Sequence, residues 1–334
     1  MRFLLDDEQR EFARSLDAML TASDTPAAIR AWTTGEHGPG RALWERLAQA
    51  GVFALAIPEE YEGVGPLPVE LAVAFTELGR HAVPGPVVET VAAAVLLDGV
   101  GGAVAKEWLP RLASGAASVT LRMDGYGPYA LDADAVDGVF TVTGDALRLA
   151  PGAGTLCVSS DPARRLWRPE PGGELLASGP RVAEAAARAA RWAAFATAAQ
   201  ALGTGEALLR ATVGYVKQRA QFGTAIGSFQ AVKHRLADTL IGLEFARPLL
   251  YGAALALAEG APDAGAEVAA AKVTAGEAGY AAARTALQLH GAVGYTQELD
   301  LSLWLRKARP LRDAWGTPGA CRARVLARTG PSAR

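Results

Sequence analysis

The chain has few of the residues that build disulfide scaffolds and metal centres. Cys157 and Cys321 are its two cysteines in 334 residues, and its four histidines do not fall at metal-ligand spacing. A structural zinc site needs a cluster of cysteine and histidine ligands, and a disulfide scaffold needs regularly spaced cysteines. We therefore expect neither a metal site nor a disulfide framework.

The chain also lacks a strong excess of either charge. It has 33 basic and 35 acidic residues, a formal net charge of -2, and arginines that are scattered rather than grouped. Proteins that bind nucleic acid usually carry a concentrated basic surface. We therefore predict no nucleic-acid partner and no attraction to an anionic membrane.

Long uninterrupted hydrophobic runs are scarce as well. The start of the chain carries acidic residues where a signal peptide needs an apolar core, and the alanine-rich run 183–202 is broken by Glu184, Arg188 and Arg191. A membrane-spanning helix needs about 20 predominantly apolar residues. With 50% hydrophobic residues in total, the sequence is typical of a globular protein, and we expect a cytoplasmic one without a membrane partner.

The pattern of the chain divides into three segments. Residues 1–114 alternate helical stretches with glycine, proline and polar turns, which predicts an N-terminal helical domain. Residues 115–180 contain short β-prone runs, such as SVTLRM and GVFTVTG, and predict a reduced middle β domain. Residues 181–334 predict long helices at about 181–217, 228–259, 263–290 and 297–313, and a last helix after Pro318.

These segments predict a mainly α fold with a small β domain and a C-terminal antiparallel four-helix bundle. In the second long helix one apolar stripe is expected to face the bundle, namely Val232, Leu236, Leu240 and Leu243. The third long helix is rich in alanine, which allows helix axes to approach closely.

Three motifs carry a resemblance to a known family. They are QRAQFGTAIGSFQAVKHRLAD at 218–238, QLHGAVGYTQELD at 288–300 and FALAIPEEYEGVGPL at 53–67. In type, order and separation they resemble the acyl-CoA dehydrogenase family, and the resemblance covers nearly the whole chain except 115–180. It implies the helix, strand, helix architecture expected above, a bound FAD, and α,β-dehydrogenation of an acyl-CoA thioester.

The resemblance also implies a set of FAD contacts. Arg219 would reach the pyrophosphate of FAD in a neighbouring subunit, a use that suits a planar guanidinium, and Phe222 would pack against the cofactor. Gln230, eleven residues after Arg219, and Gln288 match further contacts. Two more positions complete the set: Gly291, which lets backbone NH groups approach phosphate, and Thr317, 29 residues after Gln288. The family usually has a second glycine where this chain has Ala292.

The catalytic base is missing from its two usual positions. The family removes an α-proton with a carboxylate, usually the Glu of an EGT turn, while the β-hydrogen leaves as hydride to the flavin. Alignment without gaps from the GYT motif places Trp315, Gly316 and Thr317 at this turn. Ala193 occupies the alternative position of the base on the first bundle helix. Asp313 is the one acid close by in sequence and is a poor candidate, because its shorter side chain lies out of register.

Substrate contacts and partners follow from the same comparison. Trp315 and Gly316 would line the substrate site, and Arg191 could replace an arginine that helps to hold CoA in several relatives. The favoured interpretation is a subunit that contacts FAD in an α2β2 heterotetramer of the kind used in steroid degradation and lipid metabolism, with a homologous subunit supplying the base. A homo-oligomer remains open, as do a dehydrogenase with a relocated base and a flavin-dependent enzyme of different chemistry, such as a monooxygenase.

Overall fold

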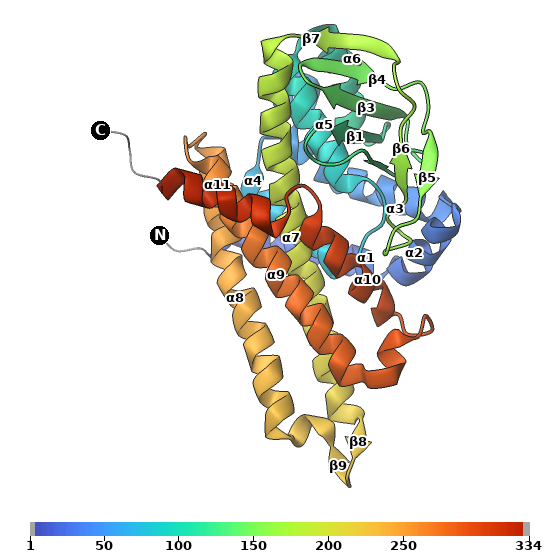
Figure 1. Ribbon diagram of the computed structural model, residues 1–334, viewed down its shortest axis with the longest axis vertical. Helices are drawn as coiled ribbons and strands as arrows, with labels where there is room; N and C mark the ends of the chain where they lie inside the picture. Colours follow the sequence, from blue (N-terminus) through green and yellow to red (C-terminus); the bar gives the residue numbers. More distant parts are fainter. Residues whose placement is uncertain (1–3, 330–334) are drawn as a thin grey trace. The chain divides into compact units, whose positions relative to one another are not determined.

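The computed structural model describes residues 4–329 (Figure 1). The predicted order of helices, strands and helices is confirmed. The N-terminal helices are α1 (Asp7–Thr21), α2 (Thr25–Thr34), α3 (Gly38–Gln49), α4 (Pro68–Arg80), α5 (Val87–Val100) and α6 (Gly102–Ala113), with short 3-10 helices η1 (Val52–Ala56) and η2 (Glu59–Tyr61).

Seven short strands follow the N-terminal helices. They are β1 (Val119–Met123), β2 (Ala130–Leu131), β3 (Gly138–Thr143), β4 (Ala146–Leu149), β5 (Thr155–Cys157), β6 (Leu166–Arg168) and β7 (Glu174–Ser178). One sheet has the order β1-β3-β4-β7, in which β1 and β3 are parallel and the other pairs antiparallel. A second sheet has the order β2-β6-β5 and is antiparallel. These strands lie within the segment 115–180 that the sequence marks as β-prone.

The C-terminal part is helical. It contains α7 (Pro180–Gln218), a hairpin of β8 (Ala220–Gln221) and β9 (Thr224–Ala225), η3 (Ile226–Ser228), α8 (Gln230–Ala258), α9 (Ala264–His290), η4 (Gly291–Tyr295), α10 (Leu301–Asp313) and α11 (Pro318–Thr329).

The chain forms two compact units that do not follow its order. One contains the start of the chain to Asp17, Ala72–Ala82 and the chain from Thr197 on; the other contains Ala18–Leu71 and Val83–Ala196. The division of the chain into domains at 114 and 180 therefore stays a prediction from sequence. In the second unit, α5 is buried from Val87 to Leu97 and packs against β1, where Thr90 Oγ1 donates to the Val119 carbonyl at 2.7 Å.

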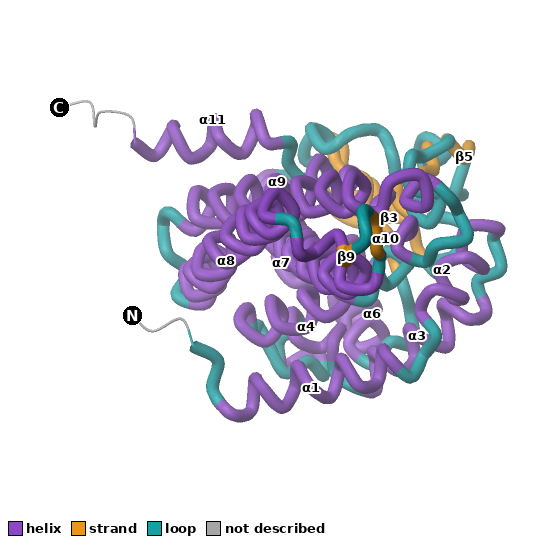
Figure 2. Tube along the Cα trace, turned by 90° about the horizontal axis from the view of Figure 1, so that it is seen from below, coloured by secondary structure: helices purple, strands orange, loops and turns teal. Residues whose placement is uncertain are grey.

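Close helix packing in the bundle depends on small residues. Helices α7, α8 and α9 run side by side, and Figure 2 shows them nearly end-on. A Cβ on Gly205 of α7 would lie 3.0 Å from the Gly279 Cα of α9 and 2.6 Å from Leu243 of α8. A Cβ on Gly279 would lie 2.6 Å from the Ala201 carbonyl oxygen. The close approach predicted for the alanine-rich third helix is therefore confirmed.

The apolar stripe predicted on α8 is wrong in part. Leu243 is buried, but Leu240 is 48% exposed and lies on an outward stripe with Ile241, Phe245 and Leu249. The apolar residues along α8 do not mark a single face, because the buried side and the outward side both carry leucine. By length and composition alone α8 could cross a membrane, yet its packing along α9 identifies it as a bundle helix.

Candidate cofactor and active site

Arg219, Phe222 and Gln230 lie together in the connection between α7 and α8. The β8–β9 hairpin follows Arg219 and carries Phe222 near its tip, and Gln230 begins α8 (Figure 1). The Phe222 φ of 53° is in the left-handed region, and the residue is 92% exposed. Arg219 and Gln230 are also exposed. An exposed aromatic side chain beside an exposed cation is a surface that suits a ligand or a second subunit.

Gln288 and Gly291 lie at the same end of the bundle as Arg219. The Tyr215 ring of α7 stacks on the His290 ring of α9 with centroids 4.1 Å apart, which holds the ends of these two helices together. Gly291 ends α9 with φ 62° and ψ -138°, and a Cβ built on it would meet no atom within 4 Å. The backbone at Gly291 is therefore open to close approach, which phosphate binding by backbone NH groups requires.

The turn between α10 and α11 carries Trp315, Gly316 and Thr317. Trp315 is 9% exposed and has φ 55°, a left-handed conformation that a bulky residue rarely adopts. Gly316 has φ 138°, and a Cβ there would lie 2.9 Å from Cys321 Sγ. Thr317 is exposed, and its Oγ1 accepts from the Ala320 NH at 3.3 Å, so that it caps α11.

The Trp315–Thr317 turn lies beside one part of α9, and Gln288 lies far from that part, near the end of the same helix. Lys272 of α9 reaches the turn, with Nζ 3.4 Å from the Gly316 carbonyl oxygen. Gln288 follows Lys272 by 16 residues of the same helix, which corresponds to about 24 Å. The predicted cofactor contacts therefore form two groups within this chain, one around Arg219 and Gln288 and the other at Thr317.

Three residues that the sequence links to the base or to CoA, namely Asp313, Ala193 and Arg191, have different surroundings. Asp313 is exposed and is the last residue of α10, where the helix dipole disfavours a negative charge. Burial raises the pKa of the Cys321 thiol, so this group is neutral at ordinary pH. Ala193 is fully buried in α7, and Arg191 is half-buried; both belong to the other compact unit.

Four other carboxylates are ion-pair partners or solvated groups. Glu206 pairs with Arg80 and, at 2.8 Å, with Arg247. Glu244 pairs with Arg247 at 3.1 Å. Glu184 and Glu298 are exposed. None of these four occupies the turn at Trp315.

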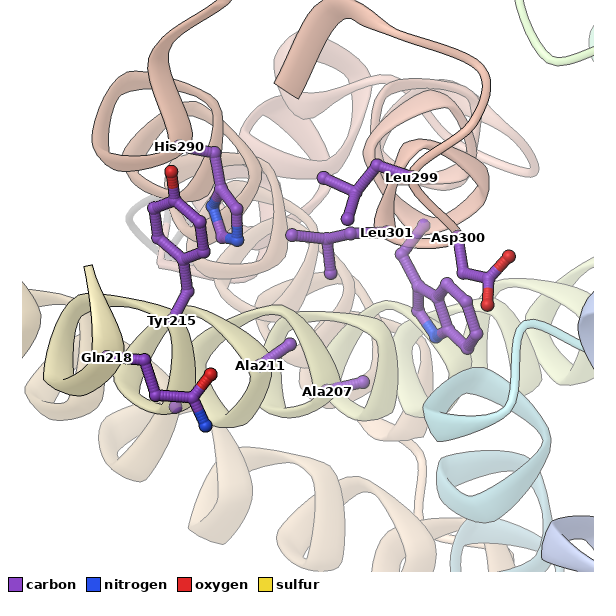
Figure 3. A pocket seen from close by; sticks show the side chains of 10 residues that line it. Ala207, Ala211, Tyr215, Gln218, His290, Leu299, Asp300 and Leu301 are labelled. Atoms are coloured by element: carbon purple, nitrogen blue, oxygen red, sulfur yellow. The ribbon is translucent and has the colours of Figure 1, made fainter. Parts of the chain in front are cut away.

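A cavity of about 510 Å³ lies beside the end of α7. Its lining is mostly apolar and includes Ala211, Leu299 and Trp304, together with Tyr215 and His290 (Figure 3). His290 Nδ1 donates to the Ala286 carbonyl at 2.8 Å, because a carbonyl can only accept. The predicted cofactor residues are not part of this lining.

These cavity residues are not among the site residues that the sequence predicts. A signal was available, since Tyr215 lies one helical turn before Arg219 and His290 directly precedes Gly291. Lys272 was missed as well; its signal in the sequence is a lysine in the middle of an alanine-rich helix, where the structure buries it.

Comparisons with known proteins agree with this architecture. The family model for the acyl-CoA dehydrogenase N-terminal domain matches residues 6–116, and the model for the acyl-CoA dehydrogenase C-terminal domain matches residues 178–329. The chain is 36% identical over 305 residues to acyl-CoA dehydrogenase IpdE2 of Mycobacterium tuberculosis, covering 90% of this chain and 91% of the relative. It is 32% identical to IpdE2 of Mycolicibacterium smegmatis over 319 residues, covering 93% and 96%.

Solved structures give the same result. The ChsE4–ChsE5 complex of Mycobacterium tuberculosis is similar with a TM-score of 0.86 and 26% identity, and the match covers 100% of both chains. A variant of the Tcur3481–Tcur3483 steroid ACAD also has a TM-score of 0.86 and 26% identity, covering 98% of this chain and 99% of that one. Sequence, fold and domain matches together show that this chain belongs to the acyl-CoA dehydrogenase family of oxidoreductases.

Proposed function

We propose that this chain is an FAD-contacting subunit of a heteromeric acyl-CoA dehydrogenase and that it lacks its own catalytic glutamate. The observation that carries the proposal is Trp315, whose side chain is buried at the position that, by the resemblance of the motifs, would carry the base. The indole N–H is a hydrogen-bond donor only, so Trp315 has no atom that can accept an α-proton.

The residues of this chain fit FAD. Arg219 offers a permanent cation and a planar set of donors for a pyrophosphate, and it is exposed at the end of α7. Phe222 offers an uncovered aromatic face, and the open space at Gly291 allows phosphate to approach the backbone. These residues lie at the same end of the bundle as Gln288, which is about 24 Å along α9 from Lys272 beside the Thr317 turn. We therefore infer that they contact the FAD of a neighbouring subunit.

The chain's own residues would bind and orient the reactants. Gln230 and Gln288 would donate hydrogen bonds to the cofactor beside Arg219, and the Thr317 hydroxyl would lie near the flavin of this subunit. Bound FAD would supply the hydride acceptor for the β-hydrogen. The backbone NH at Trp315 would polarise the thioester carbonyl, since this group does not depend on the side chain. Arg191 would contribute to holding CoA.

The partner and substrate are inferred from relatives. The ChsE4–ChsE5 structure is a complex, and the Tcur3481–Tcur3483 structure is of a steroid ACAD. By this similarity we infer a homologous partner that carries the base, and a steroid-derived acyl-CoA as substrate. A relocated base on Asp313 has less support, because that carboxylate is exposed at a helix end.

Restoring the carboxylate tests the proposal. In Trp315→Glu we expect the purified, FAD-supplemented chain to exchange the α-protons of a bound acyl-CoA with deuterium from D2O, as followed by mass spectrometry. The expected gain over the unmodified chain is about 10²- to 10⁴-fold, the usual contribution of a general base.

Trp315→Gln is the matched control, since it has the same length as Glu but no basic oxygen, and it should not exchange. Exchange by the unmodified chain at the rate of Trp315→Glu would place the base elsewhere in this chain and would refute the proposal. Absence of exchange in Trp315→Glu would show that this turn does not bind the thioester.

A further inference from the structure

Lys272 is a buried cation that lies beside the turn at Trp315. It is 1% exposed on α9, and its Nζ donates to the carbonyl oxygens of Leu311 at 2.9 Å, Arg312 at 2.8 Å and Gly316 at 3.4 Å. An ammonium group has three N–H donors and is costly to bury unless they are used. Here each donor has an acceptor on one short stretch of backbone.

Two of these acceptors belong to the end of α10. The last four carbonyl groups of a helix have no partner within the helix, and the helix dipole makes this end partly negative. Leu311 and Arg312 lie in the last turn of α10, so Lys272 satisfies carbonyls that α10 itself leaves open. Its charge also complements the dipole at this end.

The third acceptor lies beyond the helix, on the far side of Trp315. One ammonium therefore connects the backbone before Trp315 with the backbone after it. The surrounding packing is tight, since a Cβ on Gly276, one turn after Lys272, would lie 3.3 Å from the Arg312 Cα. A strained conformation such as the Trp315 φ of 55° persists only when neighbouring groups hold it.

We propose that Lys272 is a positioning residue that fixes the Trp315–Thr317 turn through these three backbone carbonyls. The bonds involve no side-chain atom of the turn, so they do not themselves depend on the side chain at position 315. The backbone NH at Trp315 and the Thr317 hydroxyl are thereby kept in place. That Lys272 holds the turn is argued from its three hydrogen bonds alone. That the held turn serves the reaction rests on the function proposed above.

Fluorine NMR of protein labelled with 5-fluorotryptophan tests the mechanical role. The chain has seven tryptophans, and Trp315→Phe identifies the signal of Trp315. In Lys272→Met, which keeps the length of the side chain but removes the donors, we expect the Trp315 signal to shift and to broaden or split. The Trp304 signal, from an earlier turn of α10, should keep its position.

Lys307→Met is the matched control, because Lys307 is a second buried lysine, at 6% exposure, on α10 itself. A general loss of stability would appear in both variants, whereas the change at Trp315 should appear in Lys272→Met alone. An unchanged Trp315 signal in Lys272→Met, or an equal change in Lys307→Met, would overturn the proposal.

A measurement on the unmodified protein covers the case in which Lys272→Met does not fold. With ¹⁵N-lysine labelling, the Lys272 ammonium should give a slowly exchanging signal at neutral pH, and its absence would contradict the three hydrogen bonds. In the Trp315→Glu background, loss of Lys272 should also reduce α-proton exchange at least tenfold. If Trp315→Glu shows no exchange, the proposed function fails while the NMR result still decides the role of Lys272.

Discussion

Asp132 is a fully buried carboxyl group in the compact unit that contains the sheets. Its Oδ1 accepts from Trp32 Nε1 at 3.0 Å and from the Arg165 NH at 3.2 Å, while its Oδ2 has no hydrogen-bond partner within the described structure. Burial raises the pKa of Asp132 from 3.8 to about 7, and the nearby carboxylate of Glu89 adds to this. Between these two pKa values the Asp132 carboxyl therefore keeps its proton in the folded protein and loses it in the unfolded chain.

The sign of the pH dependence follows from this difference. Between about pH 4 and about pH 7 the folded state binds more protons than the unfolded state, so stability falls as the pH rises through this range. We expect Asp132→Asn, which cannot ionise, to remove a decline on the order of 2 to 4 kcal/mol. Thermal unfolding at pH 5, 6, 7 and 8, with the exposed Asp145→Asn as control, measures it. Equal pH slopes for the unmodified protein and Asp132→Asn would contradict this prediction.

Residue identities were easier to predict from sequence than their surroundings. The sequence alone locates Trp315 and Arg219 within their motifs, because the motifs have fixed spacing. It does not predict the left-handed φ of Trp315 or the three bonds of Lys272, since both depend on contacts between helices distant in sequence. The functional roles of Arg219, Phe222, Gln230, Gln288, Gly291 and Thr317 stay predictions.

At the level of helices, α7 and α9 cross closely because glycines stand where they meet. We expect Gly279→Ala to destabilise the protein by about 1 to 3 kcal/mol, because its Cβ would meet a backbone carbonyl oxygen that cannot easily move. Gly214→Ala on α7 is the control: its Cβ would meet nothing within 4 Å, and alanine should stabilise the helix by about 0.5 to 1 kcal/mol. Denaturant unfolding measures both, and equal effects would contradict the prediction.

The sequence predicted the long helices well and the short elements poorly. The predicted helix at 263–290 agrees with α9 to within one residue at its start, because the helix is long and ends at a glycine. Helix α2 and the strands β2, β6 and β7 were not distinguished as separate elements within the helical segment 1–114 and the β-prone segment 115–180. Strands as short as β2, with two residues, have too few positions to show alternation, and tertiary pairing decides them.

For the whole molecule, the outward stripe of α8 predicts an oligomer. Leu240, Ile241, Phe245 and Leu249 are 36–69% exposed and recur at helical spacing, so they form an apolar surface that this chain leaves uncovered. We expect Phe245→Glu to weaken self-association or partner binding at least tenfold, as measured by sedimentation velocity at micromolar concentration. Arg235→Glu, exposed near the start of α8 and not one of the four stripe residues, should have little effect. If the unmodified protein stays a monomer on its own and does not bind its partner when the two are mixed, this prediction is wrong.

In the proposed function this chain contacts FAD but does not supply the base. Anaerobic mixing of the FAD-loaded chain with a steroid-derived acyl-CoA, followed by flavin absorbance, tests both parts of this proposal. We expect no bleaching by the chain alone and rapid bleaching by the same thioester when the homologous base-bearing subunit is present. Rapid flavin reduction by the chain without its partner would refute the proposed function, because a carboxylate or other base within this chain would then have to remove the α-proton.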